Sequence, residues 1–239
     1  MKVSNRGLLE ICEHEGVVPA PYLDSVGVWT YGVGHTASAG DPRPDRMKRG
    51  MPADINDELW KVFDLFSRDI VKYADRVNAA IKVPLKQYEF DALVSFDYNT
   101  GGIHRAKLTQ RINAKDPLAH EAFMGWIKPK EIIKRRKAEM NLFRTGDYDA
   151  NGNTIPIWKV DASGKLLNVY HTISGHNTLA MMGAGINPTH VHPQTPDVAP
   201  EKPLPIDIGL GGGAKAKPSG GIIAALLKAF AAIFKGFRK

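Results

Sequence analysis

The sequence has almost no cysteine, no acidic residue after position 209 and no long apolar run. Cys12 is the only cysteine among 239 residues, so neither an internal disulfide nor a cysteine-rich zinc module can form. No stretch of about 20 apolar residues occurs, which excludes a transmembrane helix of ordinary length. Charges at Lys2, Arg6 and Glu10 interrupt the N-terminal segment, so we expect no signal peptide. We therefore expect a chain that folds by burying a core.

The positive charge is concentrated at the C-terminus. The net charge is +7, and six basic residues but no acid lie between Leu210 and Lys239, so residues 1–209 carry only +1. A basic tail of this kind indicates an anionic partner such as a nucleic acid, a membrane surface or an anionic polymer. The 43% hydrophobic and 24% charged fractions are ordinary for a globular protein and exclude a wholly disordered chain.

Residues 1–149 have mainly the apolar spacing of helices. Ser4 can cap a helix over 4–15, which Gly16 ends. Prolines and glycines punctuate β-prone residues over 17–35, which predicts a small hairpin or sheet. Further helices are predicted over 54–82, 87–98, 107–114, 117–126 and 130–143. The fold class is therefore α+β, a mainly helical domain with a small β element near its start.

The remainder of the chain divides into three segments. Residues 150–186 predict two strands joined by a turn at 161–165, a β-prone extension whose role the sequence leaves open. Residues 187–221 hold seven prolines and a glycine run, which is typical of a linker. Residues 222–239 form an apolar and basic segment. We thus expect a domain over 1–149, the extension, the linker and a terminal helix.

Glu15, Asp24 and Thr30 are the candidate catalytic residues. Glu15 ends the first predicted helix, and Asp24 and Thr30 lie in the turn-rich segment that follows. A helix end facing a hairpin would form a cleft wall with two carboxyl groups across it. Hydrolysis of a glycosidic bond uses such a pair, one as proton donor and one as an anion. The spacing alone also fits the alternative that both acids are solvated turn and helix-end residues.

A longer pattern surrounds these three residues. The segment 15–36, EGVVPAPYLDSVGVWTYGVGHT, resembles the active-site segment of phage lysozymes of the T4 type, the muramidase endolysins. The spacings of eight residues between Glu15 and Asp24 and of five between Asp24 and Thr30 also match. The matching residues are Glu15, Gly16, Tyr22, Asp24, Gly27, Thr30, Gly32, Gly34 and His35. Segments 85–102 and 132–148 resemble the family's central and C-terminal helices, so the resemblance covers about residues 5–148.

The resemblance implies a fold, a substrate and a role for each catalytic residue. The fold would be lysozyme-like, with a small β-hairpin lobe, a long connecting helix, a helical lobe and a cleft between the lobes. Glu15 would be the general acid, and Asp24 and Thr30 would orient the attacking water, with inversion at the anomeric carbon. The bond would be the β-1,4 link between N-acetylmuramic acid and N-acetylglucosamine in peptidoglycan, cleaved without a cofactor or metal.

Tyr22, His35 and Phe96 are further candidates for substrate binding. For His35 the stronger alternative is a scaffold residue that secures the hairpin by hydrogen bonds. For Phe96 the helix core is an equally good alternative. The turn NTGGIHRAK at 99–107 departs from the longer glycine-rich loop of many relatives, which puts substrate contacts there in doubt.

Two other clusters suggest binding chemistry. Four histidines in the second half of the chain match no zinc spacing that nearby cysteines or acids would support, so we expect no metal site. Arg135, Arg136 and Lys137 could meet nucleic acid, but we expect a solvated basic face with an ion pair to Glu139. The histidines are His171, His176, His190 and His192.

Residues 222–239 are predicted to form a cationic amphipathic helix. At about 100° per residue, the large apolar side chains fall within an arc of about 140° and the cations fall outside it. Such a helix lies in the membrane interface, here facing an anionic membrane or lipopolysaccharide, rather than crossing the bilayer. The alternative is that it docks onto the lysozyme-like domain. The expected membrane contacts are Phe230, Phe234, Phe237, Lys228 and Lys235.

These observations together predict a monomeric endolysin that hydrolyses peptidoglycan and carries a membrane-active tail, natural or engineered. It would be made in the host cytoplasm, bind no nucleic acid and depend on a separate permeabilising protein for release to the wall. Two alternatives stay open. One is a lytic transglycosylase, which needs the acid but no hydrolytic water. The other is a non-catalytic wall-binding module that delivers an antimicrobial helix.

Overall fold

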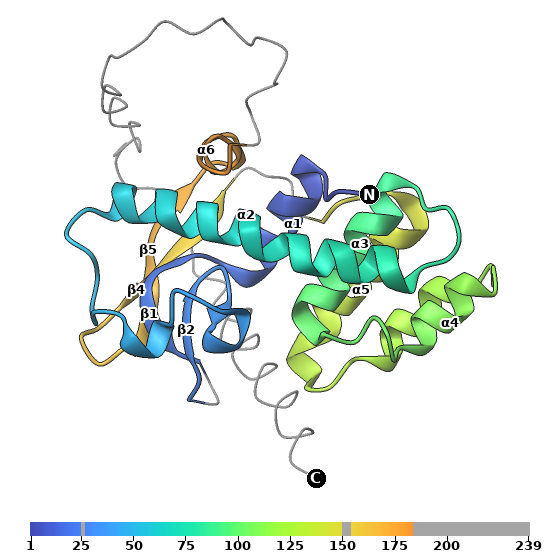
Figure 1. Cartoon of the computed structure of the whole chain (residues 1–239), viewed down its shortest axis with the longest axis horizontal. Helices are drawn as coiled ribbons and strands as arrows, with labels where there is room; N and C mark the ends of the chain where they lie inside the picture. Colours follow the sequence, from blue (N-terminus) through green and yellow to red (C-terminus); the bar gives the residue numbers. More distant parts are fainter. Residues whose placement is uncertain (25–26, 150–153, 184–239) are drawn as a thin grey trace, which may run out of the picture.

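The computed structural model describes residues 1–24, 27–149 and 154–183 (Figure 1). The predicted linker and amphipathic helix lie outside these residues. In chain order the elements are α1 (Asn5–Glu15), β1 (Val18–Leu23), β2 (Trp29–Gly32), β3 (His35–Thr36), α2 (Ile55–Ala80), α3 (Gln87–Thr100), α4 (Lys107–Asn113), α5 (Ile133–Thr145), β4 (Ile155–Val160), β5 (Leu166–Ile173) and α6 (Gly175–Met181). None of the described helices is long and apolar enough to cross a bilayer.

The long helix α2 connects a β-containing lobe to a helical lobe (Figure 1). Strands β1, β2 and β3 form an antiparallel sheet in that order, and β4 pairs antiparallel with β5. The helices α3, α4 and α5 lie at the other end of α2. The predicted apolar stripe of α2 is confirmed, because all of its members are buried except the half-buried Tyr73: Leu59, Val62, Phe63, Phe66, Ile70 and Val77. The expected α+β architecture is therefore confirmed.

The first helix is delimited by the residues that the sequence predicts. The hydroxyl oxygen of Ser4 accepts a hydrogen bond from the Gly7 amide at 3.1 Å, which satisfies one free donor of the helix start. Gly16 has a φ of +73° and its amide donates to Cys12 O at 2.8 Å, which ends the helix. Cys12 itself is buried, and burial together with the charges of Glu15 and Glu13 raises the pKa of its thiol.

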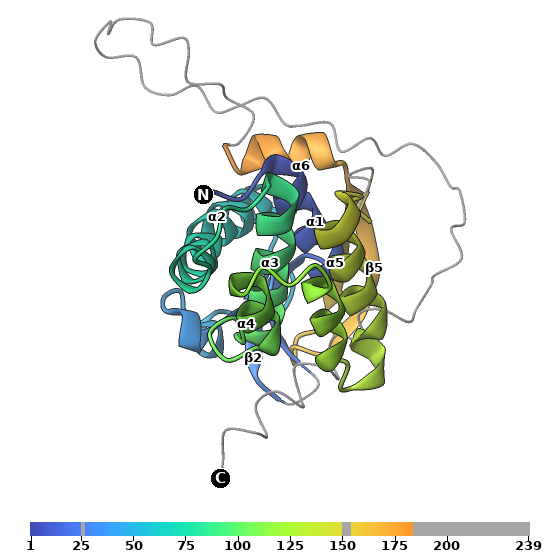
Figure 2. The same ribbon diagram turned by 90° about the vertical axis from the view of Figure 1, so that its right-hand side faces the viewer.

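The extension after residue 149 packs onto the lysozyme-like part. Its two predicted strands are confirmed as β4 and β5, and its turn at 161–165 is confirmed as well. The amide of Val17 donates to Pro156 O at 3.0 Å and the amide of Trp158 donates to Val17 O at 2.8 Å, which joins β4 to the segment before β1. Helix α6, which the sequence pattern did not indicate, packs against α1 and α2 (Figure 2).

One predicted helix has a different geometry. The segment predicted over 117–126 forms a short 3-10 helix at Ala119–Gly125 instead of an α-helix. Nucleating an α-helix fixes several residues for one hydrogen bond, so a segment confined between Pro117 and Pro129 adopts the tighter 3-10 turns that short pieces favour.

We predict that the β4–β5 extension folds cooperatively with the rest of the domain. Ile157 on β4 is 1% exposed and belongs to the main core, whereas Leu167 on β5 is 43% exposed. Ile157→Ala should lower the free energy of unfolding by about 2–5 kcal/mol through lost burial and a cavity. The matched change Leu167→Ala should alter it by about 0.5 kcal/mol or less. Urea denaturation followed by circular dichroism measures both, and equal effects of the two changes would contradict the prediction.

Candidate functional site

Glu15 is buried at the end of α1, where the chain turns toward β1. Its side chain is 3% exposed, and its Oε1 atom accepts a hydrogen bond from Arg135 Nη1 at 2.5 Å. Its other oxygen, Oε2, lies 3.9 Å from the position that a Cβ atom would take on Gly34. Gly34 has a φ of +82°. Arg135 thus holds the carboxyl group through Oε1, and the other oxygen, Oε2, faces Gly34, which has no side chain.

The basic segment of α5 is buried rather than solvated, which corrects the expectation for Arg135 and Arg136. Arg135 Nε donates to Glu139 Oε1 at 3.0 Å, so this guanidinium serves both Glu139 and Glu15. Burial lowers the pKa of Arg135, but the two carboxylates outweigh burial and raise it overall. The predicted ion pair with Glu139 is confirmed for both arginines, whereas Lys137 is exposed as expected.

Arg136 is the more deeply buried of the two arginines. It is fully buried, its Nη1 atom lies 2.8 Å from Glu139 Oε2, and its Nη2 atom donates to Asn99 Oδ1 at 2.8 Å. Burial outweighs the charge of Glu139 and lowers the pKa of Arg136 to about 10. These contacts attach α5 to α3 directly behind Glu15. Because both arginine side chains are buried, neither is accessible to a nucleic acid.

Asp24 follows the last residue of β1, and Thr30 lies in β2. The Oδ1 atom of Asp24 accepts a hydrogen bond from the Val28 amide at 2.8 Å, and the Asp24 amide donates to Val28 O at 3.0 Å. The Thr30 hydroxyl donates to the same carbonyl at 3.2 Å. The side chains of Asp24 and Thr30 are therefore both tied to Val28, which brings two of the three predicted catalytic residues to one turn.

Tyr22 lies beside this turn, opposite Thr30. It pairs with Thr30 across the β1–β2 ladder and is 8% exposed. Burial raises the pKa of the Tyr22 hydroxyl, and the charges of Glu15 and Asp24 raise it further. The β1–β2 ladder and the turn at Val28 therefore bring Tyr22, Asp24 and Thr30 together.

His35 secures β3 against α2, which agrees with the scaffold alternative. Its Nδ1 atom lies 2.6 Å from Asp69 Oδ2 and its Nε2 atom lies 2.9 Å from Pro42 O. Both neighbours are acceptors, so both ring nitrogens act as donors, as in the charged imidazolium. Burial lowers the pKa of His35, but the hydrogen bond and charge of Asp69, with the carbonyls of Pro42 and Gly40, outweigh it and raise the pKa.

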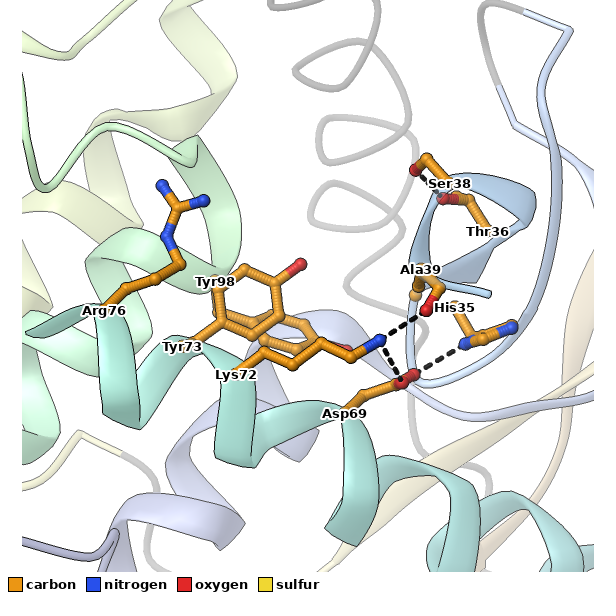
Figure 3. Close-up of a pocket in the computed structure, with 10 residues that line it drawn as sticks. His35, Thr36, Ser38, Ala39, Asp69, Lys72, Tyr73, Arg76 and Tyr98 are labelled. Carbon is orange, nitrogen blue, oxygen red and sulfur yellow. Dashed lines mark hydrogen bonds and ion pairs between the residues drawn. The ribbon is translucent and has the colours of Figure 1, made fainter. Parts of the chain in front are cut away.

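A pocket of about 210 Å³ lies between the β-containing lobe and the helices α2 and α3 (Figure 3). Lys72 bridges its two walls, because its ammonium group donates to Ala39 O and lies 4.0 Å from Asp69 Oδ1. Arg76 closes the far end and donates to Asp97 Oδ2 at 2.7 Å. The lining residues are Gly34, His35, Thr36, Ser38, Ala39, Asp69, Lys72, Tyr73, Arg76 and Tyr98.

Tyr98 and Gly34 join this pocket to the Glu15 carboxyl group. The Tyr98 hydroxyl donates to Val33 O and lies 3.6 Å from the position that a Cβ would take on Gly34. Burial raises the pKa of Tyr98, and the charge of Glu15 raises it further. Sequence reasoning missed Tyr98, Asp69 and Arg135 as parts of the site. The local signal of Tyr98 and Asp69 is a polar residue within an apolar helical pattern, whereas Arg135 lies in a basic run that gives no such signal.

Phe96 does not face the pocket, which corrects the expectation that it binds substrate. It is fully buried, and its ring packs edge-on against Phe123 and Trp126 at centroid distances of 5.5 and 5.4 Å. The guanidinium carbon of Arg136 lies 5.1 Å from its ring centroid. The ring therefore offers no surface to a ligand, and Phe96 belongs to the core of the helical lobe.

The described residues contain no group of three or more histidine, cysteine or acidic side chains that could hold a metal ion. His171 lies on β5 and His176 on α6. His190 and His192 lie outside the described part of the chain, as do the predicted membrane contacts of the tail.

Comparison with known proteins gives a consistent result over the same region. The family model described as phage lysozyme matches residues 12–139. The endolysin of Salmonella phage P22 is 31% identical over 150 residues, which cover 60% of this chain and 98% of the relative. The endolysin of Acyrthosiphon pisum secondary endosymbiont phage 1 is 32% identical over 159 residues, which cover 61% of this chain and 99% of the relative.

Solved structures agree with the sequence relatives. An endolysin from Escherichia coli O157:H7 phage FAHEc1 has a TM-score of 0.53 and 31% identity, and the match covers 62% of this chain and 96% of that one. A mutant of P22 lysozyme has a TM-score of 0.50 and 29% identity, covering 60% of this chain and 98% of that one.

Replacing Asp69 by Asn tests the His35–Asp69 pair through its pH dependence. Because the folded-state pKa of His35 is raised, the stability that the pair contributes is fully present below the unfolded-state pKa, about 6.5, and is lost as the pH rises through the folded-state value. Asp69→Asn should therefore lower the free energy of unfolding by about 3–5 kcal/mol near pH 6. The loss should be clearly smaller at about pH 9.

Urea denaturation over this pH range measures the effect, with an NMR titration of the His35 ring beside it. Asp64→Asn is the matched control on the same helix, because Asp64 forms an exposed pair with Arg68 that should contribute little at any pH. A destabilisation by Asp69→Asn that does not change with pH would contradict the charged pair.

Proposed function

Since the chain belongs to the phage lysozyme family, we propose that it hydrolyses the β-1,4 bond between N-acetylmuramic acid and N-acetylglucosamine in bacterial peptidoglycan. Membership in the family makes the chain a glycosidase of the muramidase type that lyses cell walls. The bond and the role of each residue are the finer proposal. In this proposal the enzyme is made in the host cytoplasm and acts as a monomer on the wall, without a cofactor or metal.

The geometry of Glu15 is the observation that carries this proposal. Its Oε1 atom accepts from the Arg135 guanidinium, so a proton on this carboxyl group resides on Oε2. The Oε2 atom lies on the side of Gly34, 3.9 Å from the position that a Cβ would take there, and the Tyr98 hydroxyl lies 3.6 Å from the same position. Gly34 also lines the pocket between the lobes. Glu15 would therefore donate its Oε2 proton to the glycosidic oxygen as the bond breaks.

Asp24 and Thr30 would handle the attacking water. The Val28 amide holds Oδ1 of Asp24, and the Thr30 hydroxyl proton is directed at Val28 O. This arrangement leaves the Thr30 oxygen as an acceptor for a water proton. A water held by Thr30 and polarised by the Asp24 carboxylate would attack the anomeric carbon from the face opposite Glu15, which inverts its configuration.

Glu15→Gln should reduce hydrolysis of purified peptidoglycan by about 10²–10⁴-fold, because a carboxamide cannot donate the proton. Glu13→Gln is the matched control, since Glu13 lies on the same helix but is only half-buried, and it should retain activity. Release of reducing ends measures the rate. Undiminished release by Glu15→Gln would show that Glu15 is not the acid.

Mass spectrometry of the products distinguishes the three reaction classes. Hydrolysis gives muramic acid residues with reducing ends, whereas a lytic transglycosylase gives anhydro ends. A wall-binding module without activity gives no new ends. The hydrogen-bonded positions of Asp24 and Thr30 favour hydrolysis, because only that reaction uses an activated water.

The C-terminal segment would bring the enzyme to anionic membranes. Residues 222–239 combine eight large apolar side chains on one face of a predicted helix with lysines outside it. The segment follows a linker rich in proline and glycine, which transmits little packing energy to the domain. We expect this tail to engage lipopolysaccharide or anionic phospholipid while the lysozyme domain cleaves the wall.

Replacing Phe230 and Phe234 by Ser should sharply reduce binding to vesicles of phosphatidylethanolamine and phosphatidylglycerol and killing of intact Gram-negative cells, because apolar burial is lost. Activity on purified peptidoglycan should stay unchanged. The matched control is replacement of Ala224 and Ala231 by Ser, which adds the same hydroxyls outside the apolar arc. A loss of activity on purified wall would instead show that the apolar face packs on the domain.

A further inference from the structure

The turn between β4 and β5 reaches the strands that carry the catalytic residues. The carbonyl of Gly164 accepts a hydrogen bond from the Leu23 amide at 2.8 Å. Leu23 is the last residue of β1 and directly precedes Asp24. The segment that contains Gly164 lies outside the region matched by the family model, 12–139. A contact from beyond the residues that the family model matches thus fixes the backbone next to Asp24.

The same glycine lies against Trp29, the residue before Thr30. A Cβ atom on Gly164 would lie 2.4 Å from Cζ3 and 2.5 Å from Cη2 of the Trp29 ring. Gly164 also has a φ of +86°, a conformation that favours glycine. Both the backbone conformation and the indole ring therefore require that this position carry no side chain.

Trp29 also has a close contact with Arg49. The guanidinium carbon of Arg49 lies 3.3 Å from the centroid of the Trp29 ring. Leu23 and Trp29 pair with each other in the β1–β2 ladder, and they are the last pair before the turn. The β4–β5 turn and Arg49 thus hold Leu23 and Trp29. These two residues directly precede Asp24 and Thr30 in the chain.

A small apolar cluster joins β1 to β4 next to the Leu23–Trp29 pair. Val18, Ala20 and Tyr22 of β1 are buried together with Val160 of β4. Trp158, Leu166 and Met51 pack against this cluster. Tyr22 pairs with Thr30 across the β1–β2 ladder. The extension therefore contacts β1 along its length and not only at the turn.

We propose that the β4–β5 hairpin is a positioning element for catalysis, and that Gly164 holds Asp24 and Thr30 in register with Glu15 through Leu23 and Trp29. This inference rests on the proposed hydrolysis. A displacement of about 1 Å at a catalytic group can lower a rate by about 10²-fold, so a contact that touches no substrate can still set kcat. The residues that line the pocket between the lobes include none from the hairpin, so we expect KM to stay unchanged when the hairpin is altered.

The test compares Gly164→Ala with Gly183→Ala. Gly183 also has a positive φ, +68°, but no atom of the described residues lies within 4 Å of the position that its Cβ would take. Both changes impose backbone strain, and only Gly164→Ala displaces Trp29. Gly164→Ala should lower kcat on soluble peptidoglycan fragments by about tenfold or more. Its KM and its melting temperature should stay close to those of Gly183→Ala.

Rescue identifies the displaced ring as the cause. Phenylalanine lacks the Cζ3 and Cη2 atoms that a Cβ on Gly164 would meet. The double variant Trp29→Phe with Gly164→Ala should therefore recover kcat to the level of Trp29→Phe alone. Failure of this recovery would overturn the proposed route through Trp29.

Hydrogen exchange gives a readout that does not depend on activity. The amides of Leu23 and Val28, which donate to Gly164 O and Asp24 Oδ1, should exchange faster in Gly164→Ala, whereas amides of α5 should not change. Equal kcat and exchange in Gly164→Ala and Gly183→Ala would overturn the positioning role while the wild-type hydrolysis stands. If the wild type releases no reducing ends, the proposed function fails, and exchange still tests the contact.

A milder variant covers the case in which Gly164→Ala does not fold. Arg49→Lys keeps the charge but removes the planar group that stacks on Trp29. It should lower kcat by about threefold with KM unchanged and should speed exchange at the Leu23 amide. Wild-type values for both quantities would overturn the proposal.

Discussion

The ion pair between Arg135 and Glu15 links residues that are 120 positions apart in the chain. Arg135 also binds Glu139 on its own helix and Ser95 on α3, so one buried guanidinium joins α1, α3 and α5. Breaking a buried ion pair is destabilising, although Arg135 would keep Glu139 as a partner if Glu15 were lost. A displacement of Glu15 would therefore lower the stability of the fold. The position of the proposed acid is a condition of stability as well as of catalysis.

Buried or partly buried charge pairs recur wherever two elements meet at the pocket. His35 and Asp69 join β3 to α2, and Arg76 joins α2 to α3 through Asp97. These contacts fix the distance between the pocket walls but leave the space between the walls open. A continuous apolar contact would fill that space. A polar, open pocket between the lobes is thereby compatible with a rigid frame on both sides.

Local patterns predicted much of the fold and part of the site. The stripe of α2, the cap at Ser4 and the turn at Gly16 are properties of neighbouring residues, so the sequence was sufficient for them. The family resemblance supplied the roles proposed for Glu15, Asp24 and Thr30. The burial of Arg135 was not predictable, because its main partner lies on another element and a basic run looks the same when solvated. For the same reason, the contact of Gly164 with Trp29 leaves no local signal.

The burial of Cys12 has a practical consequence. A thiolate is the reactive form of cysteine, and here the thiol is both inaccessible and held in its neutral form. The only thiol of the chain thus becomes reactive when α1 separates from the core, which also exposes Glu15. The rate of labelling by a thiol reagent at neutral pH would report this local opening directly. The protein thus carries, at a single site, a native probe of the opening of its own proposed catalytic helix.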